Sequence, residues 1–196
     1  NVEYEKELLR KAFPDVQIET YEYHDDKKEL ISIVADADAV INTYIDFDRE
    51  ILSQCKKLKV IALNAVGYNM VDVAAATEYG VMVCPAAEYC TVEVAEHTMA
   101  LLFALCRALR KYVTSIENHV WDYTIGGNVE RISGKTMTIF GFGKIGKAVA
   151  QRAQAMGIKV QVVSGSLKPE AAEALGVKLV DCDTALETSD ILSNHQ

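Results

Sequence analysis

The sequence predicts a parallel α/β protein of two domains, at residues 1–90 and 91–196. Short apolar runs alternate with segments of helical spacing along most of the chain. A glycine-rich turn near residue 141 also joins an apolar run to an amphipathic segment. We place the domain boundary near Cys90, where strand signals stop and a long helix begins.

The first domain is predicted to alternate short helices and strands. Helices are expected at residues 4–12, 30–34, 48–54 and 71–79, and strands at 16–20, 39–41, 59–64 and 81–83. The strand at 39–41 is expected to be buried because all three of its residues are apolar. Such units normally open with a strand, whereas this chain opens with Asn1 and a helix, so we expect a truncated N-terminus.

A long helix is expected to run from its N-cap at Thr91 to about Tyr112. Glutamates near its start and basic residues near its end match the helix dipole. Its apolar positions form one wide stripe, which comprises Val94, Thr98, Met99, Leu101, Leu102, Phe103, Leu105 and Leu109. Such a helix is buried between layers or at an interface. A polar loop at residues 121–134 follows it.

The glycine-rich turn is the most informative motif. Gly141, Gly143 and Gly146 form G-x-G-x-x-G between an apolar run and a helix that Gly157 ends, and a second strand follows at residues 158–163. In such a βαβ unit the first glycine permits a tight turn, and the second lets a pyrophosphate approach the backbone. The third lets the helix pack closely on the strand. Because N–H groups at the helix start can hold phosphates, the unit predicts a dinucleotide site.

The end of the second strand distinguishes one cofactor from another, because a carboxylate there binds both ribose hydroxyls and repels a 2′-phosphate. This chain has Ser164 at that position, followed by Ser166 and Lys168 with no acidic residue between them. Two hydroxyls and an ammonium can hold a phosphate, which slightly favours NADP(H) over NAD(H). Alternatively, Ser164 binds a ribose hydroxyl and Lys168 is a solvated surface residue.

The last thirty residues continue the alternation. Helices are expected at residues 169–175 and 184–188, and strands at 177–180 and 191–193. A doubly wound domain of about four strands whose last strand lies at the chain's end is incomplete. We therefore expect both domains to be partial.

Composition excludes several classes of function. The formal net charge is −8 and basic residues are scattered, which argues against a nucleic acid partner. The most apolar stretch, residues 99–106, is too short to span a membrane. The five cysteines include no C-x-x-C pair, so we expect reduced, buried thiols in a cytoplasmic protein. Glu96 and His97 lack the second histidine of a zinc-binding helix, so no metal site is expected.

Four segments resemble the D-isomer-specific 2-hydroxyacid dehydrogenase family in order and spacing. They are residues 64–72, 89–98, 141–146 and 189–195. The resemblance implies a flavodoxin-like substrate domain and a Rossmann-like NAD(P)-binding domain, acting on a small 2-hydroxy or 2-oxo acid. It also implies a homodimer whose interface includes the helix from Thr91.

The resemblance assigns several residues to the cofactor. Lys144 and Ile145 would donate backbone N–H groups to the pyrophosphate. Thr98 would lie near the nicotinamide or the phosphates. His195 would border the cofactor without being the catalytic histidine.

On the substrate side, the backbone N–H groups of Val66 and Gly67 would bind the carboxylate, which a loop of this kind can do without a charged side chain. Asn69 and Met70 depart from the Asp-Asn that family members often carry, so local hydrogen bonding is expected to differ while the turn is kept. Phosphoglycerate-specific relatives tend to carry an arginine at the position of Leu63, and its absence weakly disfavours a phosphorylated substrate.

The family's catalytic arginine, glutamate and histidine would fall beyond Gln196. We therefore expect no catalytic residue in this chain, which would be an inactive part of an active dehydrogenase. One alternative is a dinucleotide-sensing protein, since some relatives act as transcriptional co-repressors. Another keeps the fold but changes the chemistry, because related folds serve other substrates.

Overall fold

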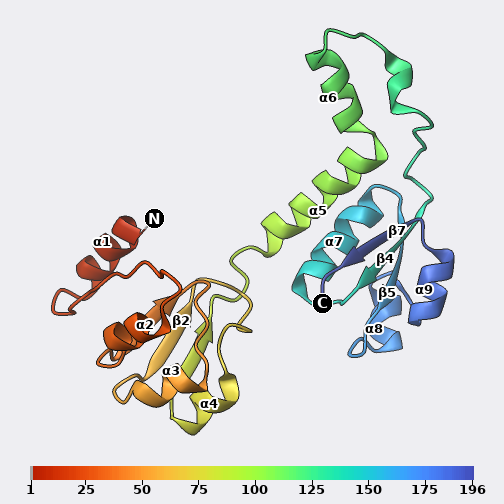
Figure 1. The fold of residues 1–196 in the computed structure, drawn as a ribbon. Helices are drawn as coiled ribbons and strands as arrows, with labels where there is room; N and C mark the ends of the chain where they lie inside the picture. The colour runs from red at the N-terminus through yellow and green to blue at the C-terminus, as the bar shows by residue number, and fades with distance from the viewer. Residues whose placement is uncertain (1) are drawn as a thin grey trace. The chain divides into compact units, whose positions relative to one another are not determined.

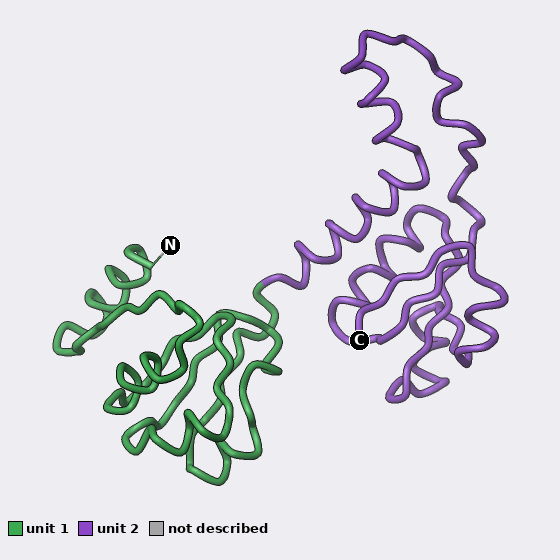
Figure 2. The backbone as a smooth tube through the Cα atoms, viewed as in Figure 1, with its two compact units in different colours: residues 1–89 green, residues 90–196 purple. Residues whose placement is uncertain are grey.

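The computed structural model describes residues 2–196. The chain divides into two compact units, residues 1–89 and 90–196 (Figure 2). Each unit has its own sheet and its own apolar core. The strand pairings within both sheets are parallel, which confirms the predicted fold class.

Unit 1 contains a sheet of strand order β1-β2-β3 (Figure 1). Its strands are β1 (Ala39–Asn42), β2 (Val60–Leu63) and β3 (Met82–Pro85). Its helices are α1 (Val2–Ala12), α2 (Lys27–Val34), α3 (Arg49–Gln54) and α4 (Val73–Glu78). The core lies between β2 and the helices, and Phe47, Ile51 and Ile61 are almost completely buried in it.

Three helices of unit 1 begin in the same way. Asp26, Asp48 and Asp72 are the N-caps of α2, α3 and α4, and each carboxylate accepts a backbone N–H from the first turn. Aspartate is among the strongest N-cap residues because it satisfies N–H groups that have no partner within the helix. These three aspartates thus set where α2, α3 and α4 start.

Two expectations for unit 1 are wrong. Residues 16–20 form no strand, because in the described part of the chain they have no neighbouring strand with which to form a hydrogen-bonded ladder. The strand at 39–41 forms but is not buried. As β1 it lies at an edge of the sheet, and Ile41 keeps 49% of its surface exposed.

Unit 2 contains a sheet of order β6-β5-β4-β7, with helices on both faces (Figure 1). Its strands are β4 (Thr136–Phe140), β5 (Lys159–Val163), β6 (Lys178–Leu179) and β7 (Ile191–Asn194). Its helices are α5 (Thr91–Cys106), α6 (Leu109–Glu117), η1 (Tyr123–Gly126), α7 (Lys144–Ala155), α8 (Pro169–Ala174) and α9 (Cys182–Thr188). Helix α5 packs against α7 and completes the core.

The long helix predicted from Thr91 to Tyr112 is divided in two. Its cap position is Cys90 instead of Thr91, and Ala108 adopts a left-handed conformation with φ of 51° between α5 and α6. The break lets α6 pack against η1, where the Tyr112 hydroxyl donates to the carbonyl of Tyr123. Helix propensity alone gives no signal for it, because the chain has neither glycine nor proline there.

The predicted apolar stripe of this region is only partly buried. Met99 and Leu102 of the stripe are buried against the unit's core, as is Ala95, which the prediction did not include. Leu105 and Leu109 are exposed, Leu105 by 80% of its surface. A solvent-facing apolar surface therefore runs along α5 and α6.

The five cysteines are free thiols, but the expectation that they are buried holds only for Cys55, since Cys90 and Cys106 are partly exposed. Cys55 is buried, whereas Cys84 and Cys182 are exposed. Within residues 2–196, no helix is both long enough and apolar enough to cross a membrane. The same residues contain no cluster of three or more side chains suited to a metal ion.

Candidate functional site

The glycine-rich turn lies between the carboxyl end of β4 and the start of α7. Gly141 has φ of 83°, and its N–H donates to the carbonyl of Val163 at 3.0 Å. A Cβ atom on Gly141 would stand 2.6 Å from the carbonyl oxygen of His195. Glycine is therefore required here both for backbone conformation and for space.

The other two glycines of the motif differ in their surroundings. A Cβ on Gly146 would collide with the carbonyl oxygen of Gly141 and lie 3.3 Å from a methyl group of Ile139. A Cβ on Gly143 would meet no atom within 4 Å. Gly146 therefore lets α7 pack on β4, whereas Gly143 leaves its face of the turn open to a ligand.

Helix α7 begins at this open face. Gly143 is its N-cap and supplies no side-chain hydrogen bond. Lys144 and Ile145 are its first two residues, where backbone N–H groups have no acceptor within the helix. A helix start of this kind, preceded by a glycine turn, favours an anionic ligand.

His195 follows β7, the strand next to β4. Its N–H donates to the carbonyl of Phe140 at 2.7 Å, and its ring Nε2 lies 2.8 Å from the hydroxyl of Ser193. Burial lowers the pKa of the His195 ring below its ordinary value, which favours the neutral imidazole. The structure thus brings His195 and Gly141 together, although they are 54 residues apart in the sequence.

A cavity of about 260 Å³ opens beside this pair. It is lined by Phe140, Leu192, Asn194 and Gln196. Sequence reasoning did not single out Phe140 or Asn194. The available signal was that Phe140 ends the apolar run before the glycine-rich turn and Asn194 follows the strand predicted at residues 191–193. Neighbouring parallel strands end at the same edge of a sheet, where ligands bind in such folds.

Ser164 follows β5 at the same edge and shapes the loop that comes after it. Its hydroxyl accepts the N–H of Leu167 at 3.2 Å and that of Ser166 at 3.4 Å. Lys168 is exposed and is the N-cap residue of α8. The structure therefore gives the Ser164 hydroxyl a structural role within the loop, beside which Ser166 and Lys168 reach solvent.

Thr98 lies on α5 and is half-buried. Its hydroxyl donates to the carbonyl of Val94 at 2.8 Å, one turn earlier in the same helix. The neighbouring Met99 packs into the core that α5 shares with α7. The hydroxyl of Thr98 is thus engaged within its own helix.

Val66 and Gly67 belong to unit 1, in the loop between β2 and α4. Both are exposed, and in the described part of the chain neither backbone N–H has an acceptor. The loop is anchored at both ends: Asn64 donates from its backbone to the carbonyl of Asn42, and Val71 donates to that of Tyr68. The loop therefore forms the expected turn, although Asn69 and Met70 differ from the residues expected at these two positions. Two adjacent N–H groups at the carboxyl edge of a sheet can bind a carboxylate.

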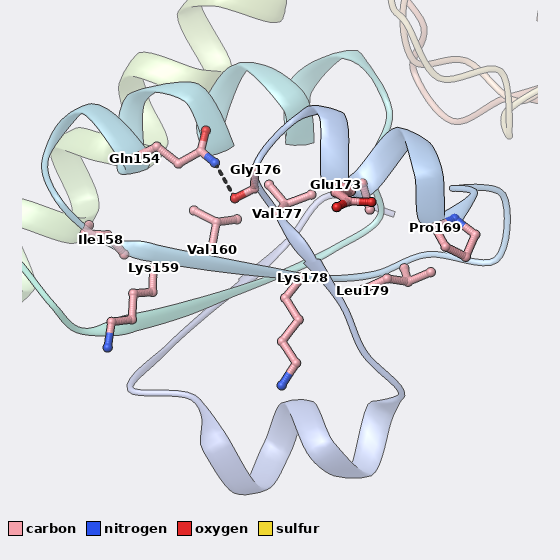
Figure 3. A pocket seen from close by; sticks show the side chains of 11 residues that line it. Gln154, Ile158, Lys159, Val160, Pro169, Glu173, Gly176, Val177, Lys178 and Leu179 are labelled. Carbon is pink, nitrogen blue, oxygen red and sulfur yellow. Dashed lines mark hydrogen bonds between the residues drawn. The ribbon is translucent and has the colours of Figure 1, made fainter.

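A larger groove of about 600 Å³ lies elsewhere in unit 2 (Figure 3). Its lining includes Lys159 and Lys178, which are the first residues of β5 and β6, and Gln154 near the end of α7. This is the amino edge of the sheet, opposite to the glycine-rich turn. Because ligands of such sheets bind outside the carboxyl ends of the strands, the larger groove is not the candidate dinucleotide site.

Known proteins resemble the chain in sequence and in fold. A glyoxylate reductase of Thermococcus litoralis is 35% identical over 173 residues, which are 85% of this chain. The structure of an acyclic imino acid reductase in complex with NADPH and D-Arg superposes with a TM-score of 0.87 at 25% identity, over 96% of this chain and 60% of that one. An NAD-dependent formate dehydrogenase of Staphylococcus aureus in complex with NAD gives a TM-score of 0.83 at 25% identity, over 100% and 59%.

The chain spans about half or less of the length of the curated relatives it matches. It covers 52% of the glyoxylate reductase and 35% of a D-3-phosphoglycerate dehydrogenase of Archaeoglobus fulgidus, to which it is 33% identical. The family profile described as "D-isomer specific 2-hydroxyacid dehydrogenase, catalytic domain" matches residues 2–176. The chain therefore belongs to the D-isomer specific 2-hydroxyacid dehydrogenase family.

Proposed function

We propose that the chain serves an oxidoreductase that transfers a hydride between a nicotinamide dinucleotide and a small 2-hydroxy or 2-oxo acid. The observation that carries the proposal is the open face at Gly143. There α7 starts without a side-chain cap, next to a parallel sheet of order β6-β5-β4-β7. The similarity to a glyoxylate reductase and to enzymes solved with NADPH or NAD supports it. When bound, the cofactor supplies or accepts the hydride.

In this proposal unit 2 is the cofactor domain. The pyrophosphate lies over Gly141, Gly143 and Gly146 and accepts the N–H groups of Lys144 and Ile145. Ser164 and its loop bind the adenosine ribose. His195 borders the cofactor, and its lowered pKa favours a ring without positive charge beside it. Thr98 lies on α5, which packs against α7, and is the remaining residue of the proposed cofactor site.

Unit 1 is the substrate domain, and Val66 and Gly67 bind the substrate carboxylate through their backbone N–H groups. Both groups are exposed and without an acceptor among the described residues, which fits them to an anion. Leu63, just before this loop, carries no charge that could hold a phosphate, so we propose a small, unphosphorylated acid such as the glyoxylate of the similar reductase.

The cofactor preference follows from the loop after β5. That loop carries hydroxyls and an exposed ammonium without a carboxylate, so we propose NADP(H) over NAD(H). Fluorescence titration of the 196-residue chain with NADPH and NADH tests both statements. Binding of NADPH tighter than NADH is expected. Tighter NADH binding overturns the preference, and no binding of either overturns the proposed function.

We also propose that the protein is a cytoplasmic homodimer. The apolar surface along α5 and α6 exposes side chains that a partner subunit would cover, namely Leu101, Leu105, Leu109, Val113 and Ile116. The free thiols fit a reducing compartment.

A further inference from the structure

Helix α8 is held to the rest of unit 2 by little apolar contact. Its sequence is Pro-Glu-Ala-Ala-Glu-Ala, and Ala172 is its one buried residue. The groove of about 600 Å³ lies between α8, the end of α7 and strands β5 and β6. Apart from the methyl group of Ala172, the apolar contacts of this segment lie outside the helix, at Leu167 before it and Val177 after it.

A polar contact adds to this attachment. The side-chain amide of Gln154, on α7, donates to the carbonyl of Leu175 at 3.1 Å, immediately after α8. It also donates to the carbonyl of Gly176 at 2.9 Å (Figure 3). Carbonyls at a helix end have no donor within the helix. Gly176 has φ of 64°, and a Cβ there would lie 3.3 Å from the Gln154 amide nitrogen. The turn after α8 is thus built around this amide.

Gln154 links two helices, α7 and α8, whose starts lie at two different places on the carboxyl edge of the sheet. Helix α7 begins at the glycine-rich turn, and α8 begins at Pro169, directly after its N-cap Lys168 and the Ser164 loop. A hydrogen bond between their far ends therefore limits how the Ser164 loop can shift relative to Gly143. We propose that Gln154 is a positioning residue for the adenosine-ribose end of the dinucleotide, an inference that rests on the proposed function.

The test replaces Gln154 by Met, which keeps the length of the side chain and removes the donor. NADPH and reduced nicotinamide mononucleotide are titrated against the 196-residue chain. The mononucleotide lacks the adenosine half. We expect the Kd for NADPH to rise about fivefold, the order expected from one lost hydrogen bond, while the Kd for the mononucleotide is unchanged.

Matched variants separate positioning from a general loss of structure. Gln151→Met, at an exposed position on the same helix, is expected to leave both constants unchanged. Gln154→Lys keeps a long donor and is expected to restore most of the NADPH affinity. An unchanged NADPH Kd in Gln154→Met, or an equal loss for both ligands, overturns the inference. Failure of the unmodified chain to bind NADPH overturns the proposed function instead.

Discussion

The carbonyl oxygen of His195 occupies the space beside Gly141 that any side chain would need. The two residues follow β7 and β4, which are paired in parallel, and the N–H of His195 donates to the carbonyl of Phe140. The distance from that carbonyl oxygen to an ideal Cβ on Gly141 is 2.6 Å. The end of one strand and the glycine-rich turn are therefore a single packed unit.

Gly141→Ala is expected to destabilise the protein by more than the cost of placing an alanine at a positive φ. Gly134→Ala is the matched control, because Gly134 has φ of 87°, close to the 83° of Gly141, with no atom within 4 Å of its Cβ position. The control should cost about 1–2 kcal/mol for the backbone conformation. Gly141→Ala should cost about 1–3 kcal/mol more, since His195 must also move. Urea unfolding followed by circular dichroism measures both, and equal losses would show that the contact with His195 is unimportant.

In contrast to Gly141→Ala, Gly143→Ala is expected to weaken NADPH binding without reducing the stability of the protein. Gly143 has a φ of −74°, which any residue adopts, and a Cβ there has no neighbour within 4 Å. The melting temperature should therefore stay the same or rise slightly. The Kd for NADPH should rise at least about tenfold, because a methyl group would hold the pyrophosphate away from the backbone. A stable variant with unchanged NADPH affinity would place the dinucleotide elsewhere.

Much of this architecture could be predicted because local sequence and fold agree. Asp48 and Asp72 mark helix starts, and Gly80 and Gly157 mark helix ends with positive φ. The G-x-G-x-x-G motif places β4, α7 and β5 without further information. These signals act over a few residues, so a single sequence contains them.

Features that depend on distant contacts could not be predicted. Ala108 takes a left-handed conformation in a segment of good helix formers, because α6 packs against η1. Residues 16–20 alternate as a strand would, yet strand formation requires a partner. The hydrogen bonds between Gln154 and the turn after α8 join residues more than twenty positions apart, and nothing near Gln154 in the sequence indicates them.

The stability of unit 2 is expected to fall in mild acid because of His195. Burial lowers the pKa of this ring in the folded state, whereas in the unfolded chain the pKa is about 6.5. The contribution is fully present above pH 6.5 and is lost as the pH falls through the lowered pKa, since protonation favours the unfolded state. His195→Gln should reduce the loss of melting temperature between pH 7.5 and 5. His97→Gln, at an exposed position on α5, should not reduce this loss. If the melting temperature depends on pH identically in the unmodified chain and both variants, burial of His195 has no such role.

Leu105→Glu is expected to shift the proposed dimer toward monomer. Leu105 keeps 80% of its surface exposed and lies in the middle of the apolar surface along α5 and α6. In the interface, the glutamate carboxylate would lose its hydration. The free energy cost of this desolvation is larger than the free energy that burial of Leu105 contributes. Sedimentation velocity over a range of protein concentrations should show a Kd for dimerisation at least about tenfold higher than in the unmodified chain. Leu186→Glu introduces the same change at an exposed leucine of α9 and should leave the dimer intact. A monomeric unmodified chain at high concentration, or equal effects of the two variants, would mean that α5 and α6 do not form the interface.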